Sequence, residues 1–206
     1  KDDAPHSPLF RLFSTALIIE TMLIMASAFM RLLLYEQAYG LTTLRLYAHA
    51  FMVWLAAVFL VLSYKIFVDA RERTFAFRIF VLAIAFLAAM NVLNPDAYIA
   101  RRNIERFAAT GKLDAHYLAL LSDDAIFESI TALALLDENA RAGLARDMSG
   151  RLSALRDDPF FSRWQSFHLA RNAARRILEA RSEELEAYKE SFSYPGDPLP
   201  QAPMTP

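Results

Sequence analysis

Residues 46–64 read LYAHAFMVWLAAVFLVLSY and contain no Asp, Glu, Lys or Arg. A helix needs about 20 mostly apolar residues to cross the hydrocarbon core of a bilayer, and about 17 is the practical minimum. The middle of this stretch is apolar on every side, whereas a core helix of a soluble bundle usually keeps a polar stripe of helical period. We therefore interpret the stretch as a transmembrane helix and disfavour the alternative, a buried helix of a soluble bundle.

Two further stretches fit the same interpretation. Residues 12–30, LFSTALIIETMLIMASAFM, carry one charge, Glu20, and residues 79–94, IFVLAIAFLAAMNVLN, form a shorter apolar run. A signal peptide fits poorly, because the first run is too long and two more follow it. The sequence predicts three membrane spans at about 12–34, 44–67 and 76–93.

The composition of the whole chain agrees with a membrane protein. Of the 206 residues 55% are hydrophobic, and the mean hydropathy is +0.22, above the values usual for soluble domains. The net charge of −1 gives no support to nucleic-acid binding. The absence of cysteine excludes disulfides, cysteine-ligated zinc and a cysteine nucleophile. The chain starts with Lys1, and we expect it to be the C-terminal part of a longer protein with further spans upstream.

Charge divides the chain into two regions. Of the 22 basic and 23 acidic residues, 14 lie in 1–94 and 31 lie in 95–206. The boundary falls at Asn94-Pro95-Asp96, which is typical of a helix start with an N-cap, a first-turn proline and a favourable negative charge. We expect a transmembrane region over 1–94, a helical extramembrane domain over 95–190 and a disordered proline-rich tail over 191–206.

The region after the spans has helical punctuation and no strand pattern. Gly111 is expected to end the helix that starts at Pro95, and Asp114 and Ser122 are expected to cap the next two. Further helices are predicted over 140–155 and from about 161 to 190. The last one has an apolar face made by Trp164, Phe167, Ala174, Ile177 and Leu178. The predicted fold class is all-α, with three transmembrane helices followed by a small all-helical domain.

Four polar residues in or near the spans are candidate site residues: Glu20, Arg31, Arg45 and His49. A charged carboxylate near the middle of a bilayer costs at least about 2.5 kcal/mol. Arg31 shares a helix face with Glu20 but lies about 16 Å along the axis, which is too far for a direct pair. Glu20 is therefore either part of an ion, proton or substrate path or a polar lock between helices. Arg45 and His49 lie one turn apart, and headgroup contact explains the arginine.

A second candidate is the polar cluster at the membrane exit. Helix capping and a solvated basic face explain most of it, and the alternative is a site that binds a lipid headgroup or a partner. The cluster consists of Asn94, Asp96, Arg102, Asn103 and Arg106.

The sequence contains no motif for catalysis. No GxSxG, Walker A or GxGxxG pattern occurs, and the four histidines lack the spacing of metal ligands. We expect no metal and no cofactor, and enzyme activity is disfavoured.

Three segments carry a resemblance to a known family. They are YEQAYGLTTLRLYAHAFMVWL, NPDAYIARRNIERF and LDAHYLALLSDDAI, with RWQSFHLARNAARRIL as a final motif in which Phe167-His168 departs from the usual Trp-Asn. Together they resemble the C-terminal part of a bacterial family of multispanning membrane proteins described as domain of unknown function 4173, with a close relative numbered 4153. The resemblance covers about 15–180. It implies a bacterial cell membrane and no assigned activity.

These observations lead to one functional expectation and two alternatives. The chain is expected to be a non-enzymatic integral membrane module for sensing, scaffolding or partner binding. The alternatives are a transporter or channel component that uses Glu20, and a membrane enzyme that acts on a lipid or cell-envelope substrate. The expected partners are the bilayer and further transmembrane helices of the same full-length protein. We expect the chain in the bacterial inner membrane. Since short basic loops favour the cytoplasm, we expect loop 65–78 on the cytoplasmic side and residues 95–206 on the outer side.

Overall fold

The computed structural model describes residues 7–68, 72–157 and 168–190. Within these ranges the chain is helical and contains no strand. It forms two compact units, Lys1–Arg106 and Phe107–Pro206. The predicted all-α fold, with three long apolar helices followed by smaller ones, is confirmed.

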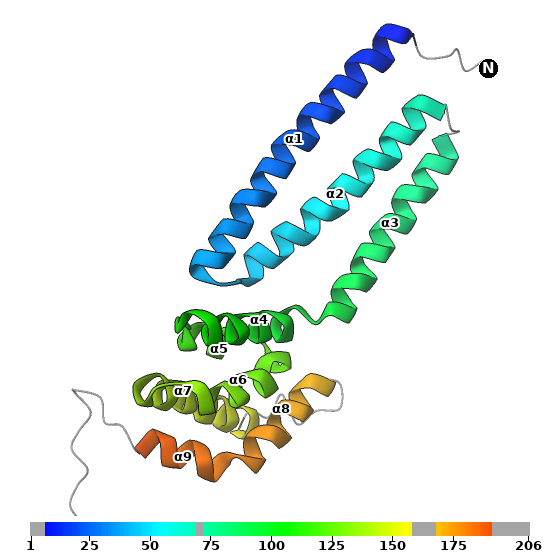
Figure 1. Cartoon of the computed structure of the whole chain (residues 1–206). Helices are drawn as coiled ribbons and strands as arrows, with labels where there is room; N and C mark the ends of the chain where they lie inside the picture. Colours follow the sequence, from blue (N-terminus) through cyan, green and yellow to red (C-terminus); the bar gives the residue numbers. More distant parts are fainter. Residues whose placement is uncertain (1–6, 69–71, 158–167, 191–206) are drawn as a thin grey trace, which may run out of the picture. The chain divides into compact units, whose positions relative to one another are not determined.

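The first unit contains three long helices that run side by side (Figure 1). They are α1 (Pro8–Tyr39), α2 (Thr43–Val68) and α3 (Glu72–Leu93), and α4 (Pro95–Thr110) follows them. Each of the first three is long and apolar enough to cross a membrane, and each extends beyond its predicted span. Ser7 starts α1 by accepting a hydrogen bond from the Phe10 amide at 3.3 Å.

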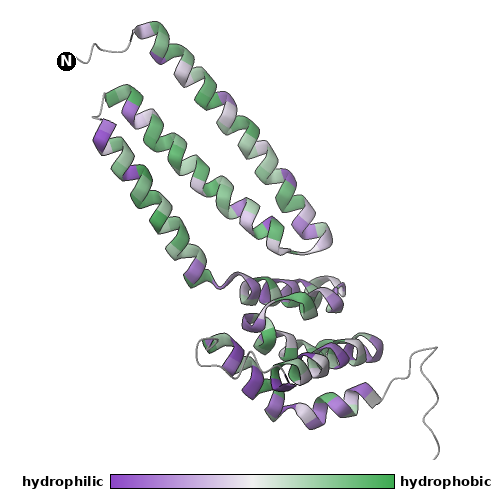
Figure 2. Ribbon diagram, turned by 180° about the vertical axis from the view of Figure 1, so that it is seen from behind, coloured by the Kyte–Doolittle hydropathy of each residue, from purple (hydrophilic) through white to green (hydrophobic). Residues whose placement is uncertain are grey.

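These long helices bury little of their apolar surface. The most apolar 18-residue windows of α1 and α3 have no buried residue, and that of α2 has 6% of its residues buried. Aromatic contacts join neighbours: Phe29 meets His49 with ring centroids 4.7 Å apart, and Trp54 meets Phe86 at 5.8 Å. Figure 2 shows hydrophobic residues along the whole length of the three helices. Apolar surface on this scale has no favourable contact with water, whereas lipid tails solvate it.

Asn94 makes the turn between α3 and α4. Its φ of +49° lies in the left-handed region, which asparagine tolerates better than most residues. Its carbonyl accepts a hydrogen bond from the Tyr98 amide at 3.0 Å. Asn94 therefore ends one helix and precedes the next, and the backbone turns so that α4 crosses beneath the connection between α1 and α2 (Figure 1).

In the second unit the described helices pack around α7. They are α5 (Ala115–Leu120), η1 (Asp123–Ala125), α6 (Ile126–Ala132), η2 (Leu133–Leu135), α7 (Glu138–Asp157), α8 (Leu169–Ala180) and α9 (Ser182–Glu190). Leu144 and Met148 on α7 are almost fully buried, as are Leu118, Leu178 and Leu185 from the surrounding helices. The short helices thus share one apolar core.

Two helix ends in this part of the chain follow the sequence prediction. Gly111 has a φ of +66° and its amide donates to the Phe107 carbonyl at 2.8 Å, which ends α4. Asp114 caps α5 by accepting from the Tyr117 amide at 2.9 Å.

Two other helix predictions need correction. Ser122 precedes a 3₁₀ turn and makes no side-chain capping hydrogen bond, and the helix expected after it is divided into η1, α6 and η2. The helix expected up to residue 190 is interrupted at Arg181. The Ser182 hydroxyl donates to the Glu179 carbonyl at 2.9 Å and α9 starts there, which brings Leu185 into the core. Trp164 and Phe167 of the predicted apolar face lie outside the described residues.

Candidate functional site

Polar side chains of α4 hold the connection between α1 and α2. The Asn103 side chain is buried, and its Oδ1 accepts from the Leu41 amide at 2.7 Å while its Nδ2 donates to the Leu41 carbonyl at 2.8 Å. Arg106 donates from Nε to the Gln37 carbonyl at 3.0 Å and from Nη2 to the Ala38 carbonyl at 2.6 Å. We call this arrangement of Asn103 and Arg106 on the backbone of Gln37, Ala38 and Leu41 the turn clamp.

The turn clamp satisfies backbone groups that a helix end leaves open. The last carbonyls of a helix have no intrahelical donor, and the C-terminal end of its dipole attracts a cation. Arg106 supplies both a donor and a positive charge at the end of α1. The Asn103 side-chain amide pairs with both the N–H and the C=O of Leu41. The buried Leu41 therefore has no unpaired backbone group.

Gly40 is the residue around which the clamp closes. Its φ of +85° and ψ of 171° lie in a region that is essentially restricted to glycine. A Cβ atom at this position would lie 2.9 Å from Asn103 Oδ1, closer than real Cβ contacts allow. Both the backbone conformation and the neighbour therefore require glycine here.

We expect Gly40→Ala to destabilise the first unit by about 1–3 kcal/mol, because alanine is strained in this conformation and its methyl group displaces Asn103. Chemical denaturation of the purified chain in detergent micelles measures the change. Gly150→Ala is the control: the position is an exposed helix interior with open space around it, and the same substitution there should stabilise by about 0.5–1 kcal/mol. Equal effects at the two positions would contradict the role given to Gly40.

The other predicted members of the membrane-exit cluster lie apart from the turn clamp. Arg102 pairs with Glu105 at 3.0 Å on the exposed side of α4, and this hydrogen bond raises the pKa of the arginine against the opposing effect of burial. Asn94 forms the α3–α4 turn, and Asp96 lies in the first turn of α4. The residues that are close together in sequence therefore do not form one cluster. Arg102, Asn94 and Asp96 each have a separate local role.

Arg45 and His49 both lie near the same connection. Arg45 donates to the Gly40 carbonyl and its guanidinium lies 6.0 Å from the centre of the Tyr39 ring. His49 Nδ1 lies 3.9 Å from Glu36 Oε2, and its buried Nε2 has no hydrogen-bond partner among the described residues. Glu36 was not a sequence candidate. Glu36 and His49 are 13 residues apart on different helices, so no sequence pattern predicts the contact. The pairing of α1 with α2 brings the two side chains together.

Glu20 and Arg31 lie on the opposite face of α1 from α2. Both are exposed, together with Ser27, while Ile18, Met25 and other residues half a turn away are partly covered. No hydrogen bond or ion pair of Glu20 or Arg31 is found within the part of the chain that the structure describes. The three polar residues form one stripe, since spacings of 7 and 11 are close to whole numbers of helical turns.

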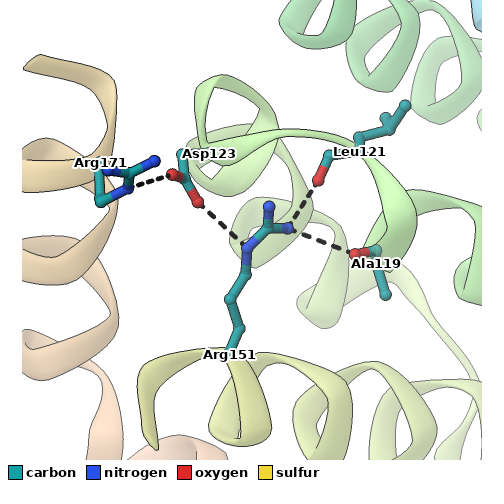
Figure 3. A network of polar contacts seen from close by, with 5 residues as sticks. All are labelled: Ala119, Leu121, Asp123, Arg151 and Arg171. Atoms are coloured by element: carbon teal, nitrogen blue, oxygen red, sulfur yellow. Dashed lines mark hydrogen bonds and ion pairs between the residues drawn. The ribbon is translucent and has the colours of Figure 1, made fainter. Parts of the chain in front are cut away.

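In the second unit Arg151 organises a network that sequence analysis missed (Figure 3). Its Nη1 donates to the Leu121 carbonyl at 2.6 Å and to the Ala119 carbonyl at 3.3 Å, and its Nε contacts Asp123 Oδ1 at 3.2 Å. Arg171 on α8 lies 3.4 Å from the other oxygen of Asp123. The network joins α5, η1, α7 and α8. Sequence analysis missed the pair of Arg151 and Asp123 because partners 28 residues apart leave no pattern in the sequence.

No group of three or more His, Asp or Glu residues that could hold a metal is found within 7–68, 72–157 and 168–190. Apart from Glu20, Ser27 and Arg31, the polar residues described above contact one another or the backbone. The candidate site is therefore the connection held by the turn clamp together with the polar stripe of α1.

A comparison with protein families matches residues 1–132 to the family described as domain of unknown function, DUF4153. The chain belongs to this family. DUF4153 is the family that the resemblance gave as the close relative, numbered 4153. Membership of family 4173 stays an expectation. No curated protein and no solved structure gives a significant match.

The matched residues of the DUF4153 chain include all three membrane-capable helices, the turn clamp and Glu20. The description of the family assigns no activity. Family membership and the three apolar helices fit an integral membrane protein of unknown activity, and they suggest a membrane location.

Proposed function

We propose that the chain is a non-enzymatic membrane module whose first span, α1, binds a further transmembrane helix through its polar stripe. The observation that carries the proposal is the position of Glu20, on the side of α1 that α2 leaves open. A mid-membrane carboxylate facing lipid is costly. A neighbouring helix that offers a cation or a hydrogen-bond donor removes most of that cost.

The charges of the stripe specify the chemistry of the partner helix. It needs a donor or cation at the depth of Glu20 and an acceptor or anion about 16 Å further along, at Arg31. A second copy of this chain inserted in the same orientation would place α1 parallel to α1, with Glu20 beside Glu20. Like charges disfavour that pairing, so we favour a helix of different sequence, from the same full-length protein.

The shape of the first unit supports this role. The turn clamp fixes the connection between α1 and α2, so α1 can present its outer face as a rigid surface. This face also contains Ala16 and Ser27, and small residues let helices approach closely in a membrane. We propose the bacterial inner membrane as the location, with residues 95–206 outside.

Cross-linking from the stripe tests the proposal. A photoreactive residue that replaces Ile24 lies on the Glu20 face of α1. One that replaces Met25 lies on the face toward α2. We expect Ile24 in native membranes to link to a peptide of another transmembrane helix, identified by mass spectrometry. Glu20→Leu should lower this yield about threefold to tenfold, the range expected for a polar contact between membrane helices.

Two control variants complete the design. Glu20→Gln keeps hydrogen bonding and should retain most of the cross-link, and Glu105→Leu, an exposed carboxylate outside the spans, should change nothing. A cross-linked product of two identical chains would replace the proposed partner by a second copy. An unchanged yield in Glu20→Leu would overturn the proposal.

A second candidate function uses the same carboxylate as part of an ion or proton path. The absence of a partner for Glu20 among the described residues is the observation that favours it. An amide cannot ionise, so Glu20→Gln should keep the cross-link but abolish complementation of a deletion strain if the path exists. Retained complementation would exclude this function.

A further inference from the structure

A groove runs between α1 and α2, to one side of the polar stripe of α1. Its volume is about 390 Å³, within the range of about 300–1,000 Å³ for small-molecule pockets. Most of its wall is apolar, and Leu17, Ile18, Phe59 and Leu62 belong to it. An apolar wall of this length matches a hydrocarbon chain.

The charged residue of the groove lies at one end, whereas Thr21 lies further inside the span and its hydroxyl donates to the Leu17 carbonyl. Ser14 is close to the start of α1, and Lys65 lies three residues before the end of α2. The ammonium of Lys65 lies 4.9 Å from the centre of the Phe75 ring, and no carboxylate lies within ion-pair distance of it in the described part of the chain. The groove is therefore apolar inside the span and positively charged at the helix ends.

A second cation lies beside this end. Arg11 precedes Ser14 by one turn on the same face of α1, and its buried Nε has no hydrogen-bond partner among the described residues. A buried guanidinium nitrogen without an acceptor is costly. An anionic group at this end of the groove would supply a counter-charge for Lys65 and for the neighbouring Arg11.

We propose that this groove is a binding site for one anionic phospholipid, with an acyl chain along Leu17, Ile18, Phe59 and Leu62 and its phosphate near Lys65 and Arg11. The order of apolar wall and cationic end matches the order of tail and headgroup in a membrane lipid. A chain whose helices cross a bilayer is always in contact with this ligand. The site is separate from the proposed helix-binding stripe, because Ser14, Ile18 and Thr21 lie between a quarter and a half of a turn around α1 from Glu20.

Native mass spectrometry of the purified chain tests the site. The protein is released from nanodiscs that contain equal amounts of phosphatidylglycerol and phosphatidylcholine with identical acyl chains. We expect one phosphatidylglycerol to remain bound. Lys65→Gln should lower the ratio of bound phosphatidylglycerol to phosphatidylcholine about fivefold, because one lysine near the headgroups contributes an attraction of that size.

Three variants make the result specific. Lys65→Arg keeps the charge and should keep the preference. Arg73→Gln removes an exposed cation near the same membrane edge that does not line the groove, and should have no effect. Leu62→Trp fills the groove and should remove both lipids, with helical content checked by circular dichroism. Equal binding of the two lipids, or an unchanged ratio in Lys65→Gln, would overturn the proposal. The proposal would also be overturned if the purified chain carried no lipid and its Leu62→Trp variant lost a cross-link to another helix.

Discussion

Replacement of Asn103 by leucine should lower the free energy of unfolding of the first unit by about 2–5 kcal/mol. Leucine has a similar shape but cannot pair with the Leu41 amide and carbonyl, which Asn103 binds at 2.7 and 2.8 Å. Each buried backbone group left without a partner costs about 1–3 kcal/mol. Leu41 is 3% exposed, so water cannot replace the lost hydrogen bonds.

Hydrogen exchange locates the effect within the chain. In Asn103→Leu, amide exchange should become faster around 37–46 and 99–106, where the turn clamp lies, and stay unchanged in α7 and α9. Arg102→Gln is the matched control, since this neighbour is exposed and its side chain pairs with Glu105 on the same helix. Surface pairs of this kind contribute about 0–1 kcal/mol. Wild-type exchange in Asn103→Leu would refute the clamp.

Replacement of Arg151 by methionine should have a comparable effect on the second unit, about 2–4 kcal/mol. The change removes the donors of the Leu121 and Ala119 carbonyls and one of the two cations beside Asp123. Asp123 is 18% exposed, and breaking a partly buried charge network leaves its remaining members poorly solvated. Methionine keeps the apolar length of the side chain, so packing is largely retained.

The same substitution on the same helix provides the control. Arg156 lies 3.7 Å from Glu179 and its side chain is 48% exposed, so Arg156→Met should cost only about 0–1 kcal/mol. Exchange rates of amides in 115–157 separate the two variants, because loss of Arg151 loosens the junction of α5, η1 and α7. Equal exchange in both variants would show that the network adds no stability to the core.

Much of the secondary structure could be predicted from local sequence. The three membrane-capable helices followed from runs of apolar residues, because length and hydropathy suffice for that inference. Gly111 and Asp114 were correctly assigned to helix ends, since their roles depend on their own backbone angle or on an amide three residues away. The interruption at Arg181 was missed, because it follows from how Leu185 reaches the core.

The contacts of the candidate site were less accessible to sequence reasoning. Arg106, and likewise Arg151 in the second unit, donates to backbone carbonyls at the end of a helix. A carbonyl is present at every residue, so its partner leaves no mark in the sequence. Sequence analysis grouped Asn103 and Arg106 with Asn94, Asp96 and Arg102 because they are close in the chain, whereas only the first two meet the α1–α2 connection.

Local sequence was sufficient to infer that this chain has three helices able to cross a membrane, that a charged helical region follows, and that Glu20 is a carboxylate within an apolar run. These properties depend on composition and on helical period, which are local. Folded contacts were needed to learn that Glu20 lies on the face of α1 opposite α2, that Asn103 and Gly40 fit against each other, and that Lys65 borders a groove. Each of these depends on which helix faces are brought together by contacts far apart in the chain, and local patterns carry no record of that pairing.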